Sequence, residues 1–304
     1  MAVTRVELRG VIVPIITPVD NEDRVDEPAF RKAIRRLITA GVHGLFVGGS
    51  GGEGPLLTAH EWQRMLEIAQ DETRDAIPLL AGAMDVSTQR IKERIRAIAA
   101  LGYQYFVVTP TYYITLKAAN EHLRLFNACA NAGAGLSMIA YNIPSCTHSV
   151  IPVEVLVDLA RRGLIQYCKE SSADLDYFKR VVAAGAPAGL RVFMGDESCM
   201  AEGLRSGAVG IVPGSANIEP STFIRAYAAA QRQDWNELTR MQSRITTLRA
   251  NIPLAGSNWI AGIKYAAGLL GIGSGRVIEP LQPLDPEQQR QLAAFIKQGS
   301  EPAE

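Results

Sequence analysis

The sequence is poor in cysteine, and the cysteines it has are widely spaced. Four occur among 304 residues, namely Cys129, Cys146, Cys168 and Cys199. No two of them form a CxxC pair, so the sequence predicts neither a disulfide framework nor a zinc site. Unpaired thiols are typical of a reducing compartment, and we therefore expect a cytoplasmic protein that binds no metal.

Excess charge, long hydrophobic runs and several common motifs are also missing. Lys plus Arg and Asp plus Glu number 31 each, and no basic tract indicates a nucleic-acid-binding face. No apolar stretch approaches the roughly 20 residues that span a bilayer, and residues 1–9 carry too much charge for a signal peptide. HExxH and the P-loop are absent. We expect a small-molecule partner, and neither nucleic acid nor membrane.

The chain does contain a repeating pattern of short apolar runs. With 47% hydrophobic residues it can bury a large core. Eight runs, each followed by a turn and a helical pattern, occupy residues 11–16, 44–47, 78–83, 105–108, 136–141, 164–168, 192–194 and 208–212. Continuous apolar runs of this length are typical of strands buried on both faces. Eight strand–helix units predict an α/β fold, the (β/α)8 TIM barrel, over residues 1–220. A doubly wound sheet is the alternative, but its glycine fingerprint is missing.

Helical patterns fill the segments between the runs. One begins near Pro28 and ends at Gly41, a second begins at a capping box over residues 58–61, and a third spans residues 87–101. After residue 220 the alternation stops, and helical patterns follow at 221–232, 235–252, 258–270 and 285–297. We expect residues 221–304 to form a C-terminal helical extension packed on the barrel.

The ends of the predicted strands carry the residues of chemical interest, as is usual in such barrels. Lys169 follows the sixth run directly. A lysine there can pair with an acid, reach water, or lie in an apolar pocket as an amine nucleophile. Burial beside Tyr167 and Cys168 would lower its pKa and leave the amine neutral. A glycine-rich turn, two tyrosine-bearing turns and residues 195–198 end other strands, so we expect them to meet Lys169 at one end of the barrel.

Four of these motifs occur together in one known family. They are the GxxGE turn at 49–53, the TPxYY turn at 109–113, YNIP at 141–144 and the lysine of the sixth strand. In these motifs, and over nearly its whole length, the sequence resembles the dihydrodipicolinate synthase / N-acetylneuraminate lyase family of Schiff-base barrels. The resemblance implies a lyase that needs no cofactor and assembles as a homotetramer, a dimer of dimers.

The resemblance also implies residue roles. Lys169 would form the imine with a 2-oxo acid of the pyruvate type, and Tyr141 would act as the general acid/base beside it. Tyr113, or Tyr112, would reach across a dimer interface and complete a proton relay. An ordinary structural role for these tyrosines, as aromatic residues that cap the barrel, is the alternative.

Substrate recognition by the loops is expected to follow the family in part. Ser50 and the backbone amides of Ser50 and Gly51 would receive the substrate carboxylate. Gly51 stands where the family often has a second hydroxyl residue, and this version of the turn resembles that of 2-keto-3-deoxy-sugar-acid aldolases. Cys146 stands where dihydrodipicolinate synthases place an arginine, and His148 where the family usually has glycine. The departures favour an aldolase over a synthase.

The leading hypothesis is a class I aldolase that splits a 2-keto-3-deoxy acid into pyruvate and an aldehyde. A dehydratase on the same scaffold, dihydrodipicolinate synthase, and a non-catalytic 2-oxo-acid-binding protein are the alternatives. The choice of aldehyde is expected to depend on four loop positions: Cys146, His148, Glu197 and Val212.

Ordinary structural roles are expected for several other polar residues. Glu53 is expected to cap or pair locally, because an acid in a turn usually bonds nearby groups. Surface or capping roles are expected for His43, His60 and His122, which fall in loop or helix contexts.

Overall fold

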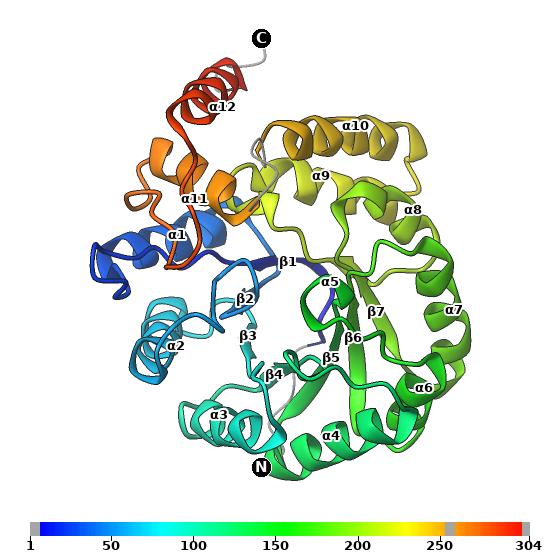
Figure 1. Ribbon diagram of the computed structural model, residues 1–304. Coiled ribbons are helices and arrows are strands. Elements are labelled where there is room, and N and C mark those ends of the chain that lie inside the picture. Colours follow the sequence, from blue (N-terminus) through cyan, green and yellow to red (C-terminus); the bar gives the residue numbers. More distant parts are fainter. Residues whose placement is uncertain (1–6, 253–258, 300–304) are drawn as a thin grey trace.

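The computed structural model describes residues 7–252 and 259–299, and at its centre eight parallel strands close into a barrel (Figure 1). The strands follow one another around the barrel in chain order, so that β1 pairs with both β2 and β8. They are β1 Gly10–Pro14, β2 Gly44–Val47, β3 Leu79–Gly82, β4 Tyr105–Val108, β5 Ser137–Asn142, β6 Ile165–Glu170, β7 Arg191–Met194 and β8 Gly210–Ile211. Each coincides with one predicted apolar run, and the (β/α)8 TIM barrel is confirmed.

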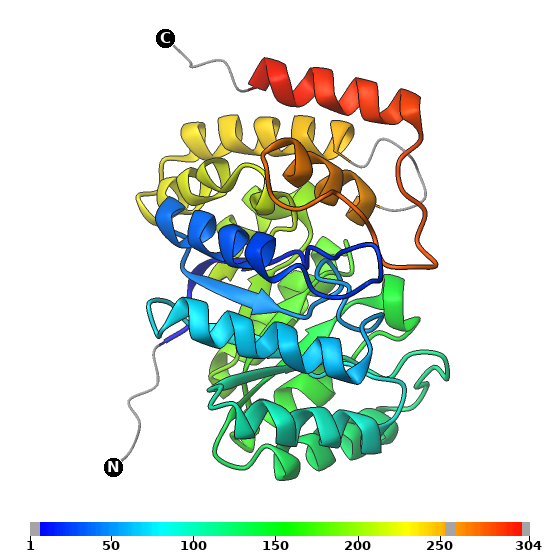
Figure 2. The ribbon, with the colours of Figure 1, turned by 90° about the vertical axis from the view of Figure 1, so that its left-hand side faces the viewer.

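Helices surround the barrel on all sides (Figures 1 and 2). They are α1 Glu27–Ala40, α2 Ala59–Thr73, α3 Thr88–Ala100, α4 Ala119–Ala132, α5 Pro144–Thr147, α6 Val153–Arg161, α7 Leu175–Gly185, α8 Met200–Arg205, α9 Pro220–Gln231, α10 Trp235–Asn251, α11 Trp259–Leu269 and α12 Pro286–Gly299. Short 3-10 turns lie at η1 Ala186–Ala188, η2 Glu197–Cys199 and η3 Ser215–Asn217. None of the helices in the described part of the chain is long and apolar enough to cross a membrane.

The strands are buried on both faces, which explains their continuous apolar runs. On β1, Ile12 belongs to the cluster that fills the barrel interior, whereas Val11 and Val13 belong to the larger cluster between the strands and the helices. Successive side chains of a strand point to opposite faces, so one short run supplies both clusters. Phe46 of β2 and Tyr141 of β5 lie in the interior cluster. That cluster is the apolar floor beneath the strand ends.

Local capping fixes where the first helices begin and end. The Asp26 side chain accepts a hydrogen bond from the Ala29 amide at the start of α1, and Gly41 ends the helix with a φ of 85°. Glycine tolerates this left-handed conformation without steric cost. Thr58 caps α2 by accepting from the Glu61 amide. These caps satisfy backbone groups that a helix end leaves without partners, which is why the predicted boundaries of α1 and α2 agree with the structure.

The C-terminal helices pack on one side of the barrel. Helix α9 contacts α8, α1, β1 and β8, and so it completes the ring beside the eighth strand. Helix α10 packs along α9, while α11 packs against η3 and α12 (Figure 2). Through α10 and α11, the chain after residue 220 reaches the end of the barrel where the candidate site lies.

Candidate active site

Lys169 lies on β6, directly beside Tyr141 of β5 in the strand register. Its side chain is 7% exposed, and its Nζ lies 4.0 Å from the centre of the Tyr141 ring and 5.2 Å from that of Phe46. No carboxylate in the described part of the chain forms a salt bridge with it. Burial lowers the pKa of Lys169 to about 7, because the apolar surroundings disfavour the ammonium form. A substantial neutral fraction, the nucleophilic form of an amine, is therefore present at neutral pH.

Tyr141 is buried between Lys169 and the barrel interior. Its ring meets Phe46 edge to face at 6.0 Å between centroids. Burial raises the pKa of Tyr141, and the nearby hydroxyls of Ser171 and Ser50 act in the opposite direction. The phenol therefore stays protonated at neutral pH, and it can donate a proton or a hydrogen bond to a group bound at Lys169.

The glycine-rich turn after β2 contains two backbone amides without an acceptor in the described part of the chain. The amides of Gly52 and Glu53 donate back to Gly49 and Ser50 at 3.1 and 3.0 Å, so these two donors are used within the turn. The amides of Ser50 and Gly51 have no acceptor among the described residues. Free amides that converge without side-chain crowding form a site for an anionic group such as a carboxylate.

Glu53 anchors this turn to the C-terminal helices, which corrects the expectation of a local partner. Its buried carboxylate accepts from Lys264 Nζ of α11, which is 211 positions away in the sequence, and from the Ile278 amide at 2.8 Å. The Thr17 hydroxyl donates to the Gly52 carbonyl at 2.7 Å and holds the other side of the turn. The sequence could not predict this partner, because no local pattern links Glu53 to a helix so far along the chain.

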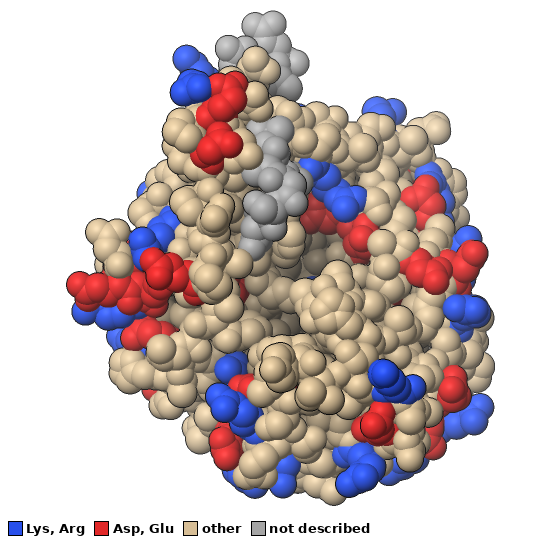
Figure 3. Space-filling model, viewed as in Figure 1, with Lys and Arg blue, Asp and Glu red and all other residues tan. Residues whose placement is uncertain are grey.

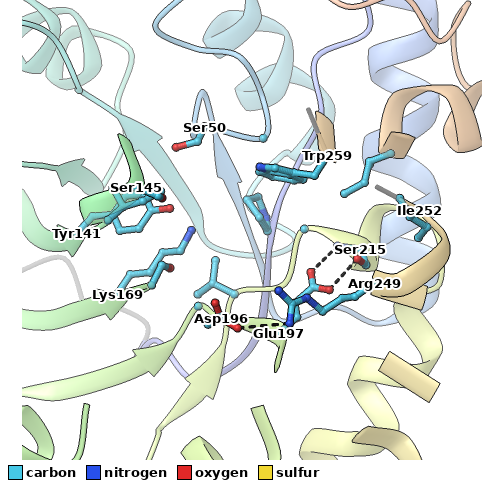
Figure 4. A pocket seen from close by; sticks show the side chains of 18 residues that line it. Ser50, Tyr141, Ser145, Lys169, Asp196, Glu197, Ser215, Arg249, Ile252 and Trp259 are labelled. Atoms are coloured by element: carbon cyan, nitrogen blue, oxygen red, sulfur yellow. Dashed lines mark hydrogen bonds and ion pairs between the residues drawn. The ribbon is translucent and has the colours of Figure 1, made fainter. Parts of the chain in front are cut away.

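Lys169, Tyr141 and the turn line one cavity of about 380 Å³ at the carboxyl ends of the strands (Figure 4). Figure 3 shows the hollow at this end of the barrel, with charged side chains on one part of its rim. Its wall is formed by Pro14, Ser50, Gly51, Tyr141, Ile143, Ser145, Lys169, Ser171, Gly195, Asp196, Glu197, Val212, Gly214, Ser215, Arg249, Ile252, Trp259 and Ile263. The predicted residues Ser50, Gly51, Tyr141, Lys169, Glu197 and Val212 are thus brought together.

Four other predicted site residues do not line this cavity. Tyr112 is half-buried near Asp85, and burial raises the pKa of its phenol. Tyr113 is 89% exposed, with a φ of 76°. Cys146 and His148, in and just after α5, are both exposed. Within one chain, therefore, none of the four forms part of the cavity wall.

Glu197 follows β7 and is fixed by the loop after β8. Its two carboxylate oxygens accept from the Ser215 amide and the Ser215 hydroxyl, each at 2.7 Å. Burial raises the pKa of Glu197, and the hydrogen bonds from Ser215 oppose this effect. Glu197 and Ser215 thus fix each other and form a polar part of the cavity wall.

Several residues of the cavity wall are absent from the sequence-based prediction. Ser171 directly follows β6 and Ser215 lies in the loop after β8, so their positions carried a usable signal. Arg249 and Trp259 belong to α10 and α11, outside the strand–helix units. Their approach to the cavity depends on how the C-terminal helices pack, which no local pattern reveals.

The remaining expectations for cysteine and histidine are met only in part. The four cysteines are free thiols, as predicted. His60 is exposed and contacts Glu61, as predicted for a residue at a helix start. His122 is buried and bonds the Ser149 hydroxyl at 3.2 Å, so the surface or capping role predicted for it is wrong. His43 is half-buried and accepts from the Val11 amide, so it joins a loop to β1.

Comparison with known proteins identifies the family. The family model of the dihydrodipicolinate synthetase family matches residues 7–299. The chain belongs to this family. A DapA-like lyase of Halobacterium salinarum is 32% identical over 95% of this chain and 93% of its own.

Solved structures of the family have the same fold. Dihydrodipicolinate synthase of Bacteroides thetaiotaomicron superposes with a TM-score of 0.91 at 27% identity, over 97% of this chain and 100% of its own. A prophage protein of the dihydrodipicolinic acid synthase family from E. coli K12, solved in complex with pyruvate, gives a TM-score of 0.89 at 25% identity, over 95% of this chain and 98% of its own. With the family established, the protein is an enzyme of the lyase class.

Proposed function

We propose that the protein is a class I aldolase that splits a 2-keto-3-deoxy acid into pyruvate and an aldehyde, and that also catalyses the reverse condensation. The observation that carries this proposal is the buried, partly neutral Lys169 amine beside the Tyr141 phenol. The solved relative that binds pyruvate supports a pyruvate-type 2-oxo acid as substrate or product.

In the proposed reaction the Lys169 amine attacks the C2 ketone and forms a carbinolamine. Tyr141 donates a proton as water leaves, which gives an iminium at Nζ. The C4 hydroxyl then loses its proton to the Tyr141 oxygen, the C3–C4 bond breaks, and its electron pair moves to the iminium. The aldehyde departs, the enamine is protonated at C3, and water releases pyruvate and the free amine.

The turn after β2 is proposed to hold the C1 carboxylate. The free amides of Ser50 and Gly51 and the Ser50 hydroxyl border the same cavity as Lys169. Preorganised donors of this kind fix the ketone relative to the amine and typically contribute a few kcal/mol to a charged transition state.

Tyr113 is proposed to act in the site of a partner subunit. It is 89% exposed and precedes Ile114, which is 69% exposed, so the loop after β4 presents large apolar side chains to its surroundings. Exposed neighbouring apolar residues are typical of an interface. We propose a homotetramer, a dimer of dimers, in which Tyr113 completes the proton relay of the adjacent subunit. The free thiols favour a cytoplasmic location for this assembly.

The deciding experiment is reduction with borohydride in the presence of pyruvate. Wild-type protein should gain the mass of the reduced pyruvate adduct, and peptide mapping should place it on Lys169. Lys169→Ala is the control and should gain none. A wild-type protein that stays unmodified would contradict the proposal.

Two assays separate the aldolase from the alternatives. Coupling to lactate dehydrogenase reports pyruvate release, which a dehydratase acting on the same imine would not produce. Condensation of pyruvate with aspartate semialdehyde tests the synthase, which is disfavoured by Cys146 in place of the family's arginine. Pyruvate release from a 2-keto-3-deoxy acid, without condensation of the semialdehyde, is the expected result.

A further inference from the structure

The cavity contains a second basic residue, Arg249 of α10, that the proposed chemistry does not use. Among the cavity-lining residues that the structure describes, Lys169 and Arg249 are the basic ones. Lys169 must be neutral to react, whereas a guanidinium stays charged at any physiological pH. Figure 4 shows Arg249 beside Asp196, Glu197 and Ser215, across the cavity from Ser50 and Tyr141. The permanent positive charge therefore lies at the end of the cavity opposite the carboxylate-binding turn.

The guanidinium of Arg249 is only loosely engaged by its neighbours. Its nearest carboxylate oxygen is Oδ1 of Asp196, at 3.6 Å, which is beyond hydrogen-bonding distance. That same oxygen already accepts from the Ser198 amide at 2.7 Å and from the Ser198 hydroxyl. Both oxygens of Glu197 are occupied by Ser215. Within the described residues, the N–H groups of Arg249 thus have no hydrogen-bonded acceptor, although its side chain is 40% exposed and borders the cavity.

On the basis of the proposed function, we propose that Arg249 binds a second carboxylate at the far end of the substrate. The substrate is then a 2-keto-3-deoxy diacid, and the aldehyde product carries the carboxylate. Arginine suits this role because its planar guanidinium group can donate two parallel hydrogen bonds to one carboxylate. The turn at Ser50 would then hold the C1 carboxylate, and the Lys169 amine would bind C2. The Arg249 guanidinium would hold the distal carboxylate at the other end of the same cavity.

The local charge favours a carboxylate over a phosphate at this position. Asp196 and Glu197 lie on the same wall as Arg249, so the positive charge is flanked by acids. A phosphate monoester carries up to two charges at neutral pH, so the flanking acids would repel it more strongly than a singly charged carboxylate.

Trp259 lies on the cavity wall and packs against two glycines. A side-chain carbon at Gly51 would lie 3.0 Å from the Trp259 ring, and one at Gly214 would lie 2.8 Å from it. The indole therefore packs directly on the backbone of the two glycines, on the cavity wall between them. A ligand must pass along this apolar wall to reach Arg249, which suits the short carbon chain of a diacid.

The experiment compares two substrates of equal chain length, a 2-keto-3-deoxy acid ending in a carboxylate and one ending in a primary alcohol. Pyruvate release is measured for wild type, Arg249→Met and Arg249→Lys. Wild type should prefer the diacid. In Arg249→Met, kcat/KM for the diacid should fall about 100-fold, mainly through KM, and change less than about threefold for the alcohol, because a charge-assisted hydrogen-bonded pair is lost only with the diacid. Arg249→Lys should recover part of the loss.

Arg240→Met is the matched control, since Arg240 lies on the same helix and is exposed beside Glu237. It should leave both substrates unaffected. A wild-type preference for the alcohol, an equal loss on both substrates in Arg249→Met, or better turnover of a phosphate-terminated analogue would each overturn the assignment. Borohydride trapping of pyruvate on Lys169 is independent of Arg249, so it shows whether the proposed function fails or only this inference.

Discussion

At the scale of single residues, burial shifts the pKa values of Lys169 and Tyr141 in opposite directions, and the proposed chemistry uses both shifts. Burial lowers the pKa of the amine to about 7 and raises that of the phenol. The amine proposed as the nucleophile is thereby partly neutral at neutral pH, while the phenol proposed as the acid keeps its proton. Both conditions arise from the same apolar floor of the barrel, to which Phe46 contributes its ring.

Imine formation should depend on pH through the Lys169 amine. Because only the neutral amine attacks a ketone, the rate should rise as pH increases through about 7 and level off above it. The rate of pyruvate trapping by borohydride, measured between pH 5.5 and 9, checks this. A profile that keeps rising toward pH 10 would show an amine with an ordinary pKa and would contradict the burial argument.

Lys169→Met should abolish activity and make the protein more stable at neutral pH. The folded-state pKa lies below the ordinary 10.5, so folding releases a proton from lysine at neutral pH and is opposed by that cost. The cost is fully present below about pH 7, falls as pH rises from about 7 to 10.5, and is gone above that. Methionine has a similar volume without the charge, so the free energy of unfolding should rise by about 1–4 kcal/mol. Urea denaturation at pH 7 and at pH 10.5 should show a gain at the first pH only.

Tyr141→Phe should slow the overall reaction and leave the fold intact. Phenylalanine keeps the edge-to-face contact with Phe46 and removes only the hydroxyl. Loss of a general acid/base typically lowers kcat by about 100- to 10,000-fold. Single-turnover kinetics of pyruvate release would measure the loss, and a near-normal kcat would assign the proton transfers to another group.

At the scale of elements, the turn after β2 depends on a helix far along the chain. Glu53 and Lys264 form an ion pair that is almost fully buried, and the Ile278 amide adds a further bond to the same carboxylate. Breaking a buried pair by removing one partner is costly, because the other charge stays buried without compensation. The pair therefore joins α11 to the amides proposed to bind the substrate carboxylate.

Lys264→Met should destabilise the protein by about 3–5 kcal/mol, because it leaves the Glu53 carboxylate buried and unpaired. In the double variant Glu53→Gln/Lys264→Met the buried charge is gone, and much of the loss should be recovered. Chemical denaturation of the single and double variants measures the coupling. If the double variant is no more stable than Lys264→Met alone, the buried charge is not the cause of the loss.

Contacts between elements that lie far apart in the chain could not be predicted from the sequence. Strands, the first helices and the strand-end residues Lys169 and Tyr141 followed from local periodicity and from the rule that barrel chemistry lies at strand ends. The partner of Glu53 and the contribution of Arg249 did not follow, because both depend on how α10 and α11 pack on the barrel. Burial of His122 was missed because its hydrogen-bond partner, Ser149, lies 27 positions away in the sequence.

At the scale of the whole molecule, the cavity of one chain contains the Lys169 amine, the adjacent Tyr141 phenol and the turn proposed to bind the substrate carboxylate. It does not contain the second tyrosine that the family resemblance implies. Tyr113 is exposed on the loop after β4, whereas Tyr112 is half-buried near Asp85. An exposed tyrosine can enter a neighbouring subunit's site, and the half-buried one is held within its own chain. The proposal that the site is completed by assembly therefore rests on Tyr113.

Mixing two inactive variants tests this proposal directly. Lys169→Ala lacks the nucleophile, and Tyr113→Phe lacks the hydroxyl offered to the partner; each alone should be nearly inactive. In a mixed dimer, the subunit that keeps Lys169 receives Tyr113 from the Lys169→Ala subunit, so one intact site forms. With random exchange in a two-fold dimer, activity should recover to about a quarter of the wild-type value.

The variants must be co-expressed or dissociated and reassociated, and mixing without subunit exchange is the control. If activity does not recover after exchange has been verified by mass, or if Tyr113→Phe alone is fully active, Tyr113 does not act across the interface.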